Sequence, residues 1–375
     1  MAWPGPPVDP GTGPWHSGRM HPRAALPRVI AVIRAAALTL AGVVVFAPQT
    51  HLGQWLSTRL LITQALAFPG LTGAGLVAGG AIALALGATV PVLRRSGARL
   101  AAVVMIVLGL GLGVFPDGPP WVAGPSAAAG NTGRTLRVSA FNSLDTLSLA
   151  DVQEILGAAD PDVLVLPEAS PGRVAEAVAG TAFAPGVHAT PDAGFSSGRL
   201  PWVAPTAVVV HPRGGAYRSG TPTPMTFGSV HLDPVPGTAD PTILAVHTAP
   251  PVPRMMDAWR DDLARLGEVD DDAARGPLIL AGDLNATLRH GPLAGRAHLA
   301  DTAEQCPSRA GGTWPAAAPA WAQAPINHVL VSTDIEVVSC ATLRVGASDH
   351  LVYSVELRLP GPGSPEAPFP AGAGP

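Results

Sequence analysis

Polar residues follow several apolar runs in this chain, at the points where an enzyme built of strands and helices would carry its chemistry. The clearest run is Leu278–Ala281, which is short and apolar and predicts a buried strand. Gly282 is expected to end this strand in a sharp turn. Asp283 and Asn285 then stand two residues apart, so both side chains face one side of the loop. Asp and Asn at such places commonly bond their own backbone, so the motif taken alone favours an ordinary turn.

Four other strand ends carry the same kinds of residue. Asn142, Glu168 and His247 each follow an apolar run, and Asp349-His350 precede another. A lone Glu is usually solvated and a lone His is more often packed than catalytic. Active-site residues of layered α/β proteins nevertheless collect beyond the ends of strands. Five such strand ends in one chain therefore predict a shared site.

Charge is distributed unevenly along the chain. Residues 1–130 carry eight arginines against Asp9 and Asp117, a net charge of +6, whereas residues 131–375 carry fifteen arginines against twenty-five acids, a net charge of −10. An acidic second part argues against a general nucleic-acid binder, which needs a positive face. The 43 glycines and 42 prolines predict long loops and unstructured ends.

Three apolar runs in the basic part predict membrane helices, at 29–47, 71–93 and 100–115. The first run is also compatible with a secretory signal, although no clean cleavage site follows it. Three runs this close together, with a basic loop at 94–99, favour membrane helices over buried core helices. Basic residues before the first run and in the loop predict a cytoplasmic N-terminus and an extracytoplasmic segment after residue 116.

The chain is expected to divide into five parts. These are a disordered basic tail (1–27), a membrane region (28–116), a linker (117–133), a soluble α/β domain (134–359) and a disordered tail (360–375). In the soluble part, strands are predicted at 136–141, 163–166, 206–211, 226–231, 243–247, 278–281, 326–331 and 351–357. Helices are predicted at 148–158, 172–179 and 255–266.

The motifs in this soluble part resemble those of the endonuclease/exonuclease/phosphatase superfamily, which includes pancreatic deoxyribonuclease, abasic-site endonucleases, neutral sphingomyelinases and inositol polyphosphate phosphatases. The resemblance covers about residues 134–359. It rests, in chain order, on the segments 137–142, 163–168, 245–250, 282–285, 326–331 and 348–350. With three apolar runs before it, the chain looks like the membrane-anchored bacterial branch. The resemblance implies a four-layer α/β/β/α sandwich.

The resemblance also implies a divalent cation and a set of ligands for it. Glu168 would be the main ligand of Mg²⁺ or Mn²⁺, with Asn142 and Asp349 nearby. Hard oxygen ligands with retained waters suit Mg²⁺, which seldom has a full protein cage. The ion would polarise a phosphoryl oxygen and offset charge on the leaving group.

The remaining motif residues would act on the phosphate itself. By the same resemblance, Asp283 would orient or deprotonate the attacking water and Asn285 would hold a phosphate oxygen. His247 and His350 would flank the phosphate as acid, base or hydrogen-bond donors. The sequence does not decide which histidine is the acid and which the base.

One position departs from the family pattern. The family has an acid where this chain has Asn327, the residue that would orient His350. An amide accepts a hydrogen bond but does not stabilise an imidazolium, and the comparable change in serine proteases costs about four orders of magnitude in turnover. We therefore expect a slowed enzyme, or one that uses His350 as a neutral hydrogen-bond donor. Trp314 resembles a family loop residue, and we expect it to be a packed loop anchor.

Two predictions concern residues outside these motifs. Cys306 and Cys340 both fall in the part expected outside the cytoplasm, and an even count there predicts one disulfide between them. Six other histidines are expected to be structural or at the surface: His188, His211, His231, His290, His298 and His328.

The leading hypothesis is a multi-pass membrane protein with an extracytoplasmic, Mg²⁺-dependent phosphoesterase that hydrolyses a phosphodiester or phosphomonoester. The expected partners are the membrane and a phosphoester carried by a lipid headgroup, a nucleic acid or a small molecule, with no specific protein partner. One alternative is an extracellular metal-dependent nuclease. The other, which depends on Asn327, is a catalytically weakened envelope protein that binds a phosphoryl ligand.

Overall fold

The structure is a computed structural model that describes residues 1, 5, 22–89, 96–122, 124–190, 203–306 and 311–361. Most of each predicted tail, the end of the second apolar run and much of the basic loop lie outside these residues. The chain divides into two compact units, Met1–Ala41 and Gly42–Pro375. The first unit contains most of helix α1, and the second contains every other helix and strand named below.

Helices form at all three apolar runs and also between the first two. They are α1 (Pro22–Phe46), α2 (His51–Ser57), α3 (Ile62–Ala67), α4 (Pro69–Thr89) and α5 (Ser96–Val114). Helix α1 begins within the range predicted as a tail. By length and composition, α4 and α5 are apolar enough to cross a membrane. A third span results if α1 and α2, which meet at a bend of 95°, are taken as one.

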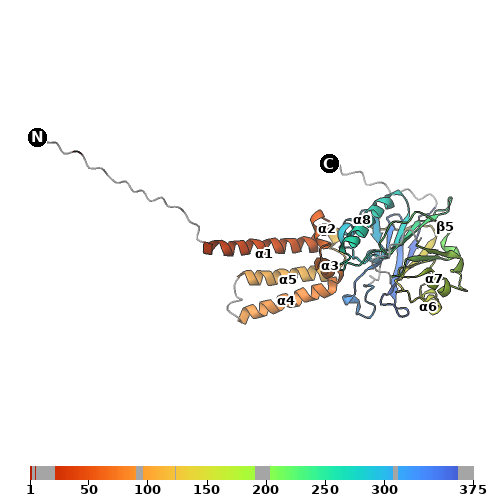
Figure 1. Cartoon of the computed structure of the whole chain (residues 1–375), viewed down its shortest axis with the longest axis horizontal. Helices are drawn as coiled ribbons and strands as arrows, with labels where there is room; N and C mark the ends of the chain where they lie inside the picture. Colours follow the sequence, from red (N-terminus) through yellow and green to blue (C-terminus); the bar gives the residue numbers. More distant parts are fainter. Residues whose placement is uncertain are drawn as a thin grey trace. The chain divides into compact units, whose positions relative to one another are not determined.

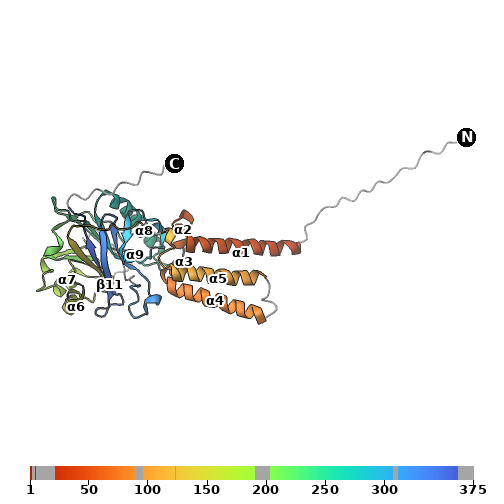
Figure 2. The same cartoon turned by 180° about the vertical axis from the view of Figure 1, so that it is seen from behind.

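Glycines bring α4 and α5 into close contact, and the two helices run side by side in Figure 2. A Cβ atom on Gly73 would lie 2.7 Å from the carbonyl oxygen of Gly109, and one on Gly80 would lie 2.6 Å from that of Ala102. Only glycine leaves room for backbones this close, as small residues do between membrane helices. The pair therefore packs backbone against backbone.

Twelve strands in the described residues form two six-stranded sheets (Figure 1). The first sheet has the order β11-β12-β1-β2-β4-β3 and the second β5-β6-β7-β8-β10-β9. The strands of the first sheet are β1 (Thr135–Ala140), β2 (Val163–Leu166), β3 (Val187–Ala189), β4 (Ala207–Val210), β11 (Glu336–Leu343) and β12 (Val352–Arg358). Those of the second are β5 (Tyr217–Ser219), β6 (Ser229–Pro234), β7 (Thr242–His247), β8 (Leu278–Asp283), β9 (Leu299–Asp301) and β10 (Asn327–Ser332).

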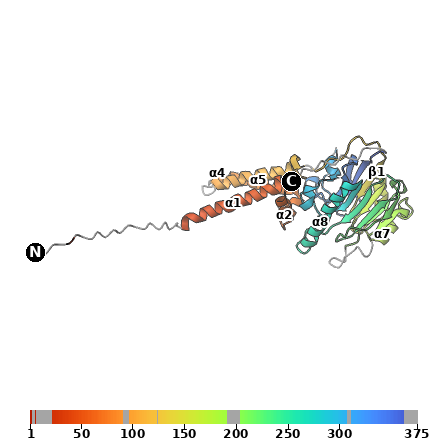
Figure 3. The same cartoon turned by 90° about the horizontal axis from the view of Figure 1, so that it is seen from above.

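Apolar side chains from both sheets meet in a central core, and helices cover the outer faces. The core joins Val138 and Val165 of the first sheet to Ile243, Ile279 and Val329 of the second. Helices α6 (Leu149–Ala159) and α7 (Pro171–Ala177) pack on the first sheet, while α8 (Met256–Asp272) packs on the second. Figure 3 shows α7 and α8 on opposite sides of the strands. The predicted four-layer α/β/β/α architecture is confirmed.

Four strands were not expected from the sequence. Strands β3, β5 and β9 have only three residues each, which is too short to show an alternating pattern. Strand β11 lies at the edge of its sheet and mixes apolar and polar residues, so its sequence carries no continuous apolar run. The predicted disulfide is present: Cys340 on β11 is joined to Cys306, which follows the short helix α9 (Thr302–Gln305), with their Cα atoms 5.9 Å apart.

The ends of the apolar helices are bonded directly to the soluble part. The side chain of Arg289 is fully buried and donates to the carbonyl of Val45 at 3.0 Å, to that of Pro116 at 2.8 Å and to that of Phe115. Val45 lies in the last turn of α1, and Phe115 directly follows α5. Burial lowers the pKa of Arg289 to about 10, against the opposing charge of Asp117. The guanidinium therefore stays charged near neutral pH and satisfies carbonyls at two helix ends.

Replacing Arg289 by Met is expected to destabilise the protein by about 3 kcal/mol or more, because three buried carbonyls lose a charged donor. Thermal unfolding of the full chain in detergent micelles measures the effect. Arg275→Met is the matched control, since Arg275 is 77% exposed and pairs only with Asp272 of the same helical turn. Equal midpoints for the two variants would contradict the expected role of Arg289.

Candidate active site

Strand pairing brings three of the predicted residues together in the second sheet. His247 ends β7 and lies opposite Asp283 in the parallel pair with β8. Asn327 begins β10 and lies opposite Asp283 in the antiparallel pair on the other side. Asp283 is therefore the middle residue of a row of three, and its side chain is only 1% exposed.

The sequence predicts that Gly282 ends the strand in a sharp turn, and this prediction is wrong. Strand β8 continues through Gly282 to Asp283. The φ angle of Gly282 is 145°, and a Cβ atom there would lie 2.0 Å from the carbonyl oxygen of Val246 on β7. The glycine is needed for close approach of two strands, and this approach keeps Asp283 in register with His247.

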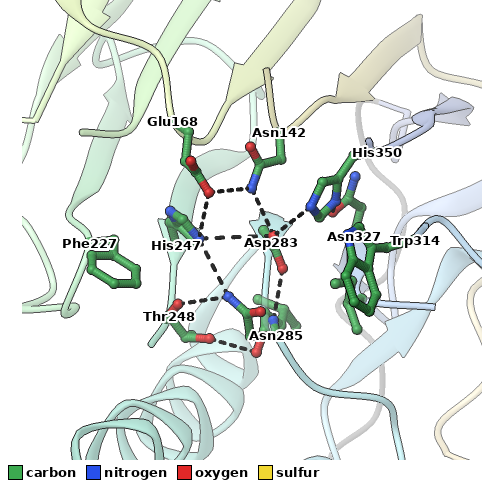
Figure 4. A network of polar contacts seen from close by, with 12 residues as sticks. Asn142, Glu168, Phe227, His247, Thr248, Asp283, Asn285, Trp314, Asn327 and His350 are labelled. Atoms are coloured by element: carbon green, nitrogen blue, oxygen red, sulfur yellow. Dashed lines mark hydrogen bonds and ion pairs between the residues drawn. The ribbon is translucent and has the colours of Figure 1, made fainter. Parts of the chain in front are cut away.

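Two carboxylates from different sheets face each other across one amide (Figure 4). Asn142 follows β1, and its Nδ2 atom donates to Glu168 Oε1 at 3.0 Å and to Asp283 Oδ2 at 2.9 Å. Glu168 follows β2 with a φ angle of 49°, a left-handed conformation that is uncommon for this residue type. The carbonyl of Glu168 is bonded by the Ser143 hydroxyl at 2.7 Å, which helps to hold that conformation.

His247 stands beside both carboxylates. Its Nε2 atom is 3.8 Å from Glu168 Oε1 and 3.9 Å from Asp283 Oδ2. The ring of Phe227 packs against the imidazole with 4.9 Å between centroids. The Nδ1 atom of His247 is buried, and no residue of the described ranges bonds it. The packing of Phe227 helps to hold this ring in place.

Asn285 is held from three sides. Its Nδ2 atom donates to the carbonyl of Thr248 at 3.0 Å and lies 3.4 Å from His247 Nε2, while its backbone N–H donates to Asp283 Oδ1 at 2.9 Å. The indole N–H of Trp259 on α8 donates to the Asn285 carbonyl at 3.1 Å. The residue has a φ angle of 43°, which Asn tolerates well. Its amide is thus presented beside His247.

His350 closes the opposite side of the site. Its Nδ1–H donates to Asn327 Oδ1 at 3.1 Å, and its Nε2 atom is 3.8 Å from Asp283 Oδ2. The Asn327 amide is oriented by its other bond, from Nδ2 to the carbonyl of Leu351 at 3.1 Å. That bond turns the amide oxygen toward His350 and so assigns the proton of the neutral imidazole to Nδ1.

Sequence reasoning missed two residues that hold this site. The indole of Trp314 donates to Asp349 Oδ2 at 2.8 Å and lies 6.4 Å from the His350 ring, so Trp314 is more than a packed loop anchor. Asp262 on α8 accepts from the backbone N–H of Ala249 at 2.8 Å and fixes the segment after His247. Burial raises the pKa of Asp262, although its hydrogen bonds oppose this. The signal available in the sequence was an acid, Asp262, on the apolar side of a predicted helix. The sequence does not tell which residue such an acid bonds.

A comparison with protein families matches residues 138–350 to the endonuclease/exonuclease/phosphatase family. The chain belongs to this family. A comparison with curated proteins found no match. Among solved structures, an endonuclease/exonuclease/phosphatase from Beutenbergia cavernae is 23% identical, with 61% of this chain and 72% of that chain covered and a TM-score of 0.47.

Two further solved structures are also similar to this chain. A humanized TDP2 from D. rerio is 14% identical, with 60% of this chain and 99% of that chain covered and a TM-score of 0.46. A mannosyl-6-phosphatase from Bacteroides thetaiotaomicron is 14% identical, with 59% and 99% covered and a TM-score of 0.42. Endonuclease/exonuclease/phosphatase enzymes are typically phosphoesterases that depend on a divalent metal.

The residues of the family site fit a hard cation. Glu168 and Asp283 bring two carboxylates to one amide nitrogen, and the only basic groups within ion-pair distance of either, among the described residues, are His247 and His350. Within the described ranges, no group of three or more His, Cys, Asp or Glu side chains is arranged as a metal cage. Mg²⁺ seldom uses such a cage, because it keeps several waters and takes one or two carboxylates.

A buried ion pair supports the family's site loop from behind. His328 follows Asn327 on β10, and its Nδ1 atom lies 2.6 Å from Asp301 Oδ2. Its Nε2 atom lies 3.0 Å from the carbonyl of Ala286 and 2.8 Å from that of Pro325. Since both ring nitrogens face acceptors, the ring is an imidazolium. Burial lowers the pKa of His328, but the charge and hydrogen bond of Asp301 outweigh it and raise that pKa above 6.5.

The stabilising effect of His328 is expected to depend on pH. A folded-state pKa raised above the unfolded value gives stability that is fully present below pH 6.5 and is lost as pH rises through the folded pKa. The free energy of unfolding lost in His328→Gln should therefore be larger at about pH 6 than at about pH 9. Denaturant unfolding of both proteins at each pH measures this difference. A loss that grows toward alkaline pH would contradict the ion pair.

Proposed function

We propose that this protein is a membrane-anchored, Mg²⁺-dependent phosphoesterase that acts outside the cytoplasm. The observation that carries the proposal is the contact of Asn142 Nδ2 with the carboxylates of Glu168 and Asp283, with a histidine on each side of Asp283. Two carboxylates held together need a positive charge, and an imidazole can donate or accept a proton. This combination suits the transfer of a phosphoryl group to water.

Each side chain has a role that its contacts support. Asp283 accepts the backbone N–H of Asn285 on Oδ1 and the side-chain amide of Asn142 on Oδ2. Held in this way, it orients or deprotonates the attacking water. Asn285 donates one amide N–H to the Thr248 carbonyl, and its other N–H, on the side of His247, would hold a phosphate oxygen. His247 and His350 flank the phosphate and donate or accept a proton at Nε2, which in each ring faces Asp283.

We expect the cation to bind on the side of the site that carries Glu168 and Asp349. Glu168, Asn142 and Asp349 would hold it, and once bound it would polarise a phosphoryl oxygen and offset charge on the leaving group. The indole of Trp314 holds Asp349 in one orientation, and the left-handed backbone at Glu168 aims that carboxylate at Asn142. These two contacts fix the directions of the Asp349 and Glu168 carboxylates, whereas Asn142 would have to turn its amide oxygen, which now accepts from the N–H of Leu144, toward the ion.

Three observations support an anchored domain outside the cytoplasm. Helices α4 and α5 have the length and composition of membrane spans. Arginines gather around the N-terminal end of α1 and around the segment that joins α4 to α5, the pattern of cytoplasmic segments. The Cys306–Cys340 disulfide belongs in an oxidising compartment.

A second candidate is a weakened protein that binds a phosphoryl ligand without turning it over efficiently. The bond between Asn327 and His350 favours it, because an amide at this place does not stabilise an imidazolium. The two candidates differ in how much activity the site retains, which the variants below measure.

Glu168→Gln is expected to lower Mg²⁺-dependent hydrolysis of a bis-aryl phosphate by about two to three orders of magnitude, because the main carboxylate of the site loses its charge. Chelation should abolish the activity and added Mg²⁺ restore it. Electron paramagnetic resonance of bound Mn²⁺ should show weaker binding by the same variant. Glu154→Gln, an exposed change on α6, is the control. Unchanged hydrolysis in chelator would contradict a metal-dependent site.

Asn327→Asp is expected to raise the hydrolysis rate by about tenfold or more, since an acid bonded to Nδ1 stabilises the protonated His350 ring. Hydrolysis rates measured across a pH series test for this gain. Gln153→Glu, an exposed change from amide to acid on α6, controls for added negative charge. If Asn327→Asp brings no gain, His350 works as a neutral donor in this protein.

A further inference from the structure

Residues at the edge of the site contact the short helix α3, which leads into the apolar helix α4. Helix α3 ends at Ala67 and α4 begins at Pro69. Gln64 Nε2 on α3 donates to the carbonyl of Pro251 at 2.5 Å, in the segment that follows His247. The ring of Phe68 lies 5.8 Å from that of Trp314, which lies 6.4 Å from His350. Both sides of the site therefore contact residues 64–68.

The catalytic loop between these two sides contacts the same region. His290 Nε2–H donates to the carbonyl of Thr63 at 3.1 Å, and the N–H of Gly291 donates to the Ser57 hydroxyl at 2.9 Å. These residues follow Asn285 directly along the chain, and the His290 ring meets Trp259, which bonds the Asn285 carbonyl. The site and the loop after it therefore contact residues 57–68, the segment that leads into α4.

Large apolar side chains are exposed around this junction. We call Trp55, Leu61, Trp121 and Trp321 the interfacial collar; their exposed fractions are 55%, 77%, 65% and 60%. Each is near a helix end. Trp121 bonds the carbonyl of Phe46 at the end of α1, and the backbone of Trp321 lies against Gly70 of α4. Tryptophans concentrate where a membrane meets water, and apolar groups this exposed need such a cover.

If α4 and α5 span a membrane, the collar and the start of α4 would bring the site close to the lipid headgroups. The headgroup layer is roughly 5–8 Å thick on each side of the apolar core of a bilayer. Only two ring contacts, Phe68 to Trp314 and Trp314 to His350, separate the start of α4 from a residue of the site. A lipid phosphate in the same leaflet can therefore reach the site while its acyl chains stay in the bilayer.

The charges favour a single lipid phosphate over a nucleic acid. Residues 131–375 carry a net charge of −10. A nucleic acid presents many phosphates and needs a tract of Lys and Arg, whereas one headgroup phosphate needs neutralising only at the site itself.

We propose that the substrate of this site is a phosphoester lipid of the membrane in which the chain is anchored. The inference rests on the proposed phosphoesterase function. The collar sits in the headgroup layer, the acyl chains of the substrate remain in the leaflet, and its phosphate enters the space between His247 and His350. A water molecule attacks phosphorus, the bond from phosphorus to the leaving oxygen breaks, and that oxygen takes up a proton.

The full chain is reconstituted in vesicles of phosphatidylcholine, phosphatidylethanolamine and phosphatidylglycerol with Mg²⁺, and lipid products are measured by mass spectrometry. Parallel reactions contain the matching water-soluble glycerophosphodiesters, a single-stranded oligonucleotide, or a bis-aryl phosphate. Lipid hydrolysis is expected to exceed that of the glycerophosphodiesters by about tenfold or more at equal phosphate concentration. Equal or faster hydrolysis of the soluble diesters or of the oligonucleotide would overturn the inference.

Leu61→Asp tests the collar without touching the site. Leu61 has a φ angle of 71°, which Asp adopts more readily than Leu, so the variant is expected to fold. Lipid hydrolysis should fall by about tenfold, because a charge replaces an apolar group in the headgroup layer. Hydrolysis of the bis-aryl phosphate should stay within about twofold. Val235→Asp, 39% exposed on the loop after β6, should change neither rate.

The outcomes separate the two proposals. If the bis-aryl phosphate is hydrolysed but lipids are not, the lipid substrate is wrong and the phosphoesterase stands. If lipids are preferred but Leu61→Asp leaves their hydrolysis unchanged, the collar is not what brings the lipid to the site. If none of the four substrates is hydrolysed with Mg²⁺, the phosphoesterase itself is wrong and the lipid inference fails with it.

Discussion

Two negative side chains held together at the join between two sheets are the constraint on which the site depends. Glu168 comes from the first sheet and Asp283 from the second, and the Asn142 amide bonds both. The two carboxylates repel each other, and because Asp283 is buried, water screens this repulsion less. The left-handed backbone at Glu168, the close approach at Gly282 and the two flanking histidines all serve to hold these carboxylates in place.

The fold was largely predictable from the sequence because its main strands are buried on both faces. Continuous apolar runs such as Val163–Leu166 and Ile243–Val246 therefore predict strands within a residue or two. The short strands and the edge strand β11 escaped prediction, since pairing with neighbours rather than their own apolar pattern defines them. Gly282 shows the same limit, because a glycine required for close approach looks like a turn glycine in sequence.

The sequence predicted the types of the site residues and their order along the chain. It did not predict the residues that hold them in place. Motifs identify Glu168, Asp283 and His350 as candidates whose roles remain proposals. The contacts of Trp314 with Asp349 and of Asp262 with Ala249 join residues 35 and 13 positions apart, and no local pattern announces them. The segment 117–133 was expected to be a linker, yet Ala128 pairs with Glu336 and Asn131 bonds two segments of the soluble part, at 334–336 and at Arg358. Proline and glycine content predicted irregular structure there but not its contacts.

The buried Arg289 sets an order of events for the newly made chain. Its three acceptors lie 173 to 244 residues earlier, at the ends of α1 and α5. Without those carbonyls the guanidinium would be buried with no partner, a state too costly to persist. The loop that carries Asp283 and Asn285 can therefore close only on helices that are already folded and in place. A molecule in which these helix ends are out of place is left with an open loop, so the packing of α1 and α5 becomes a condition for forming the site.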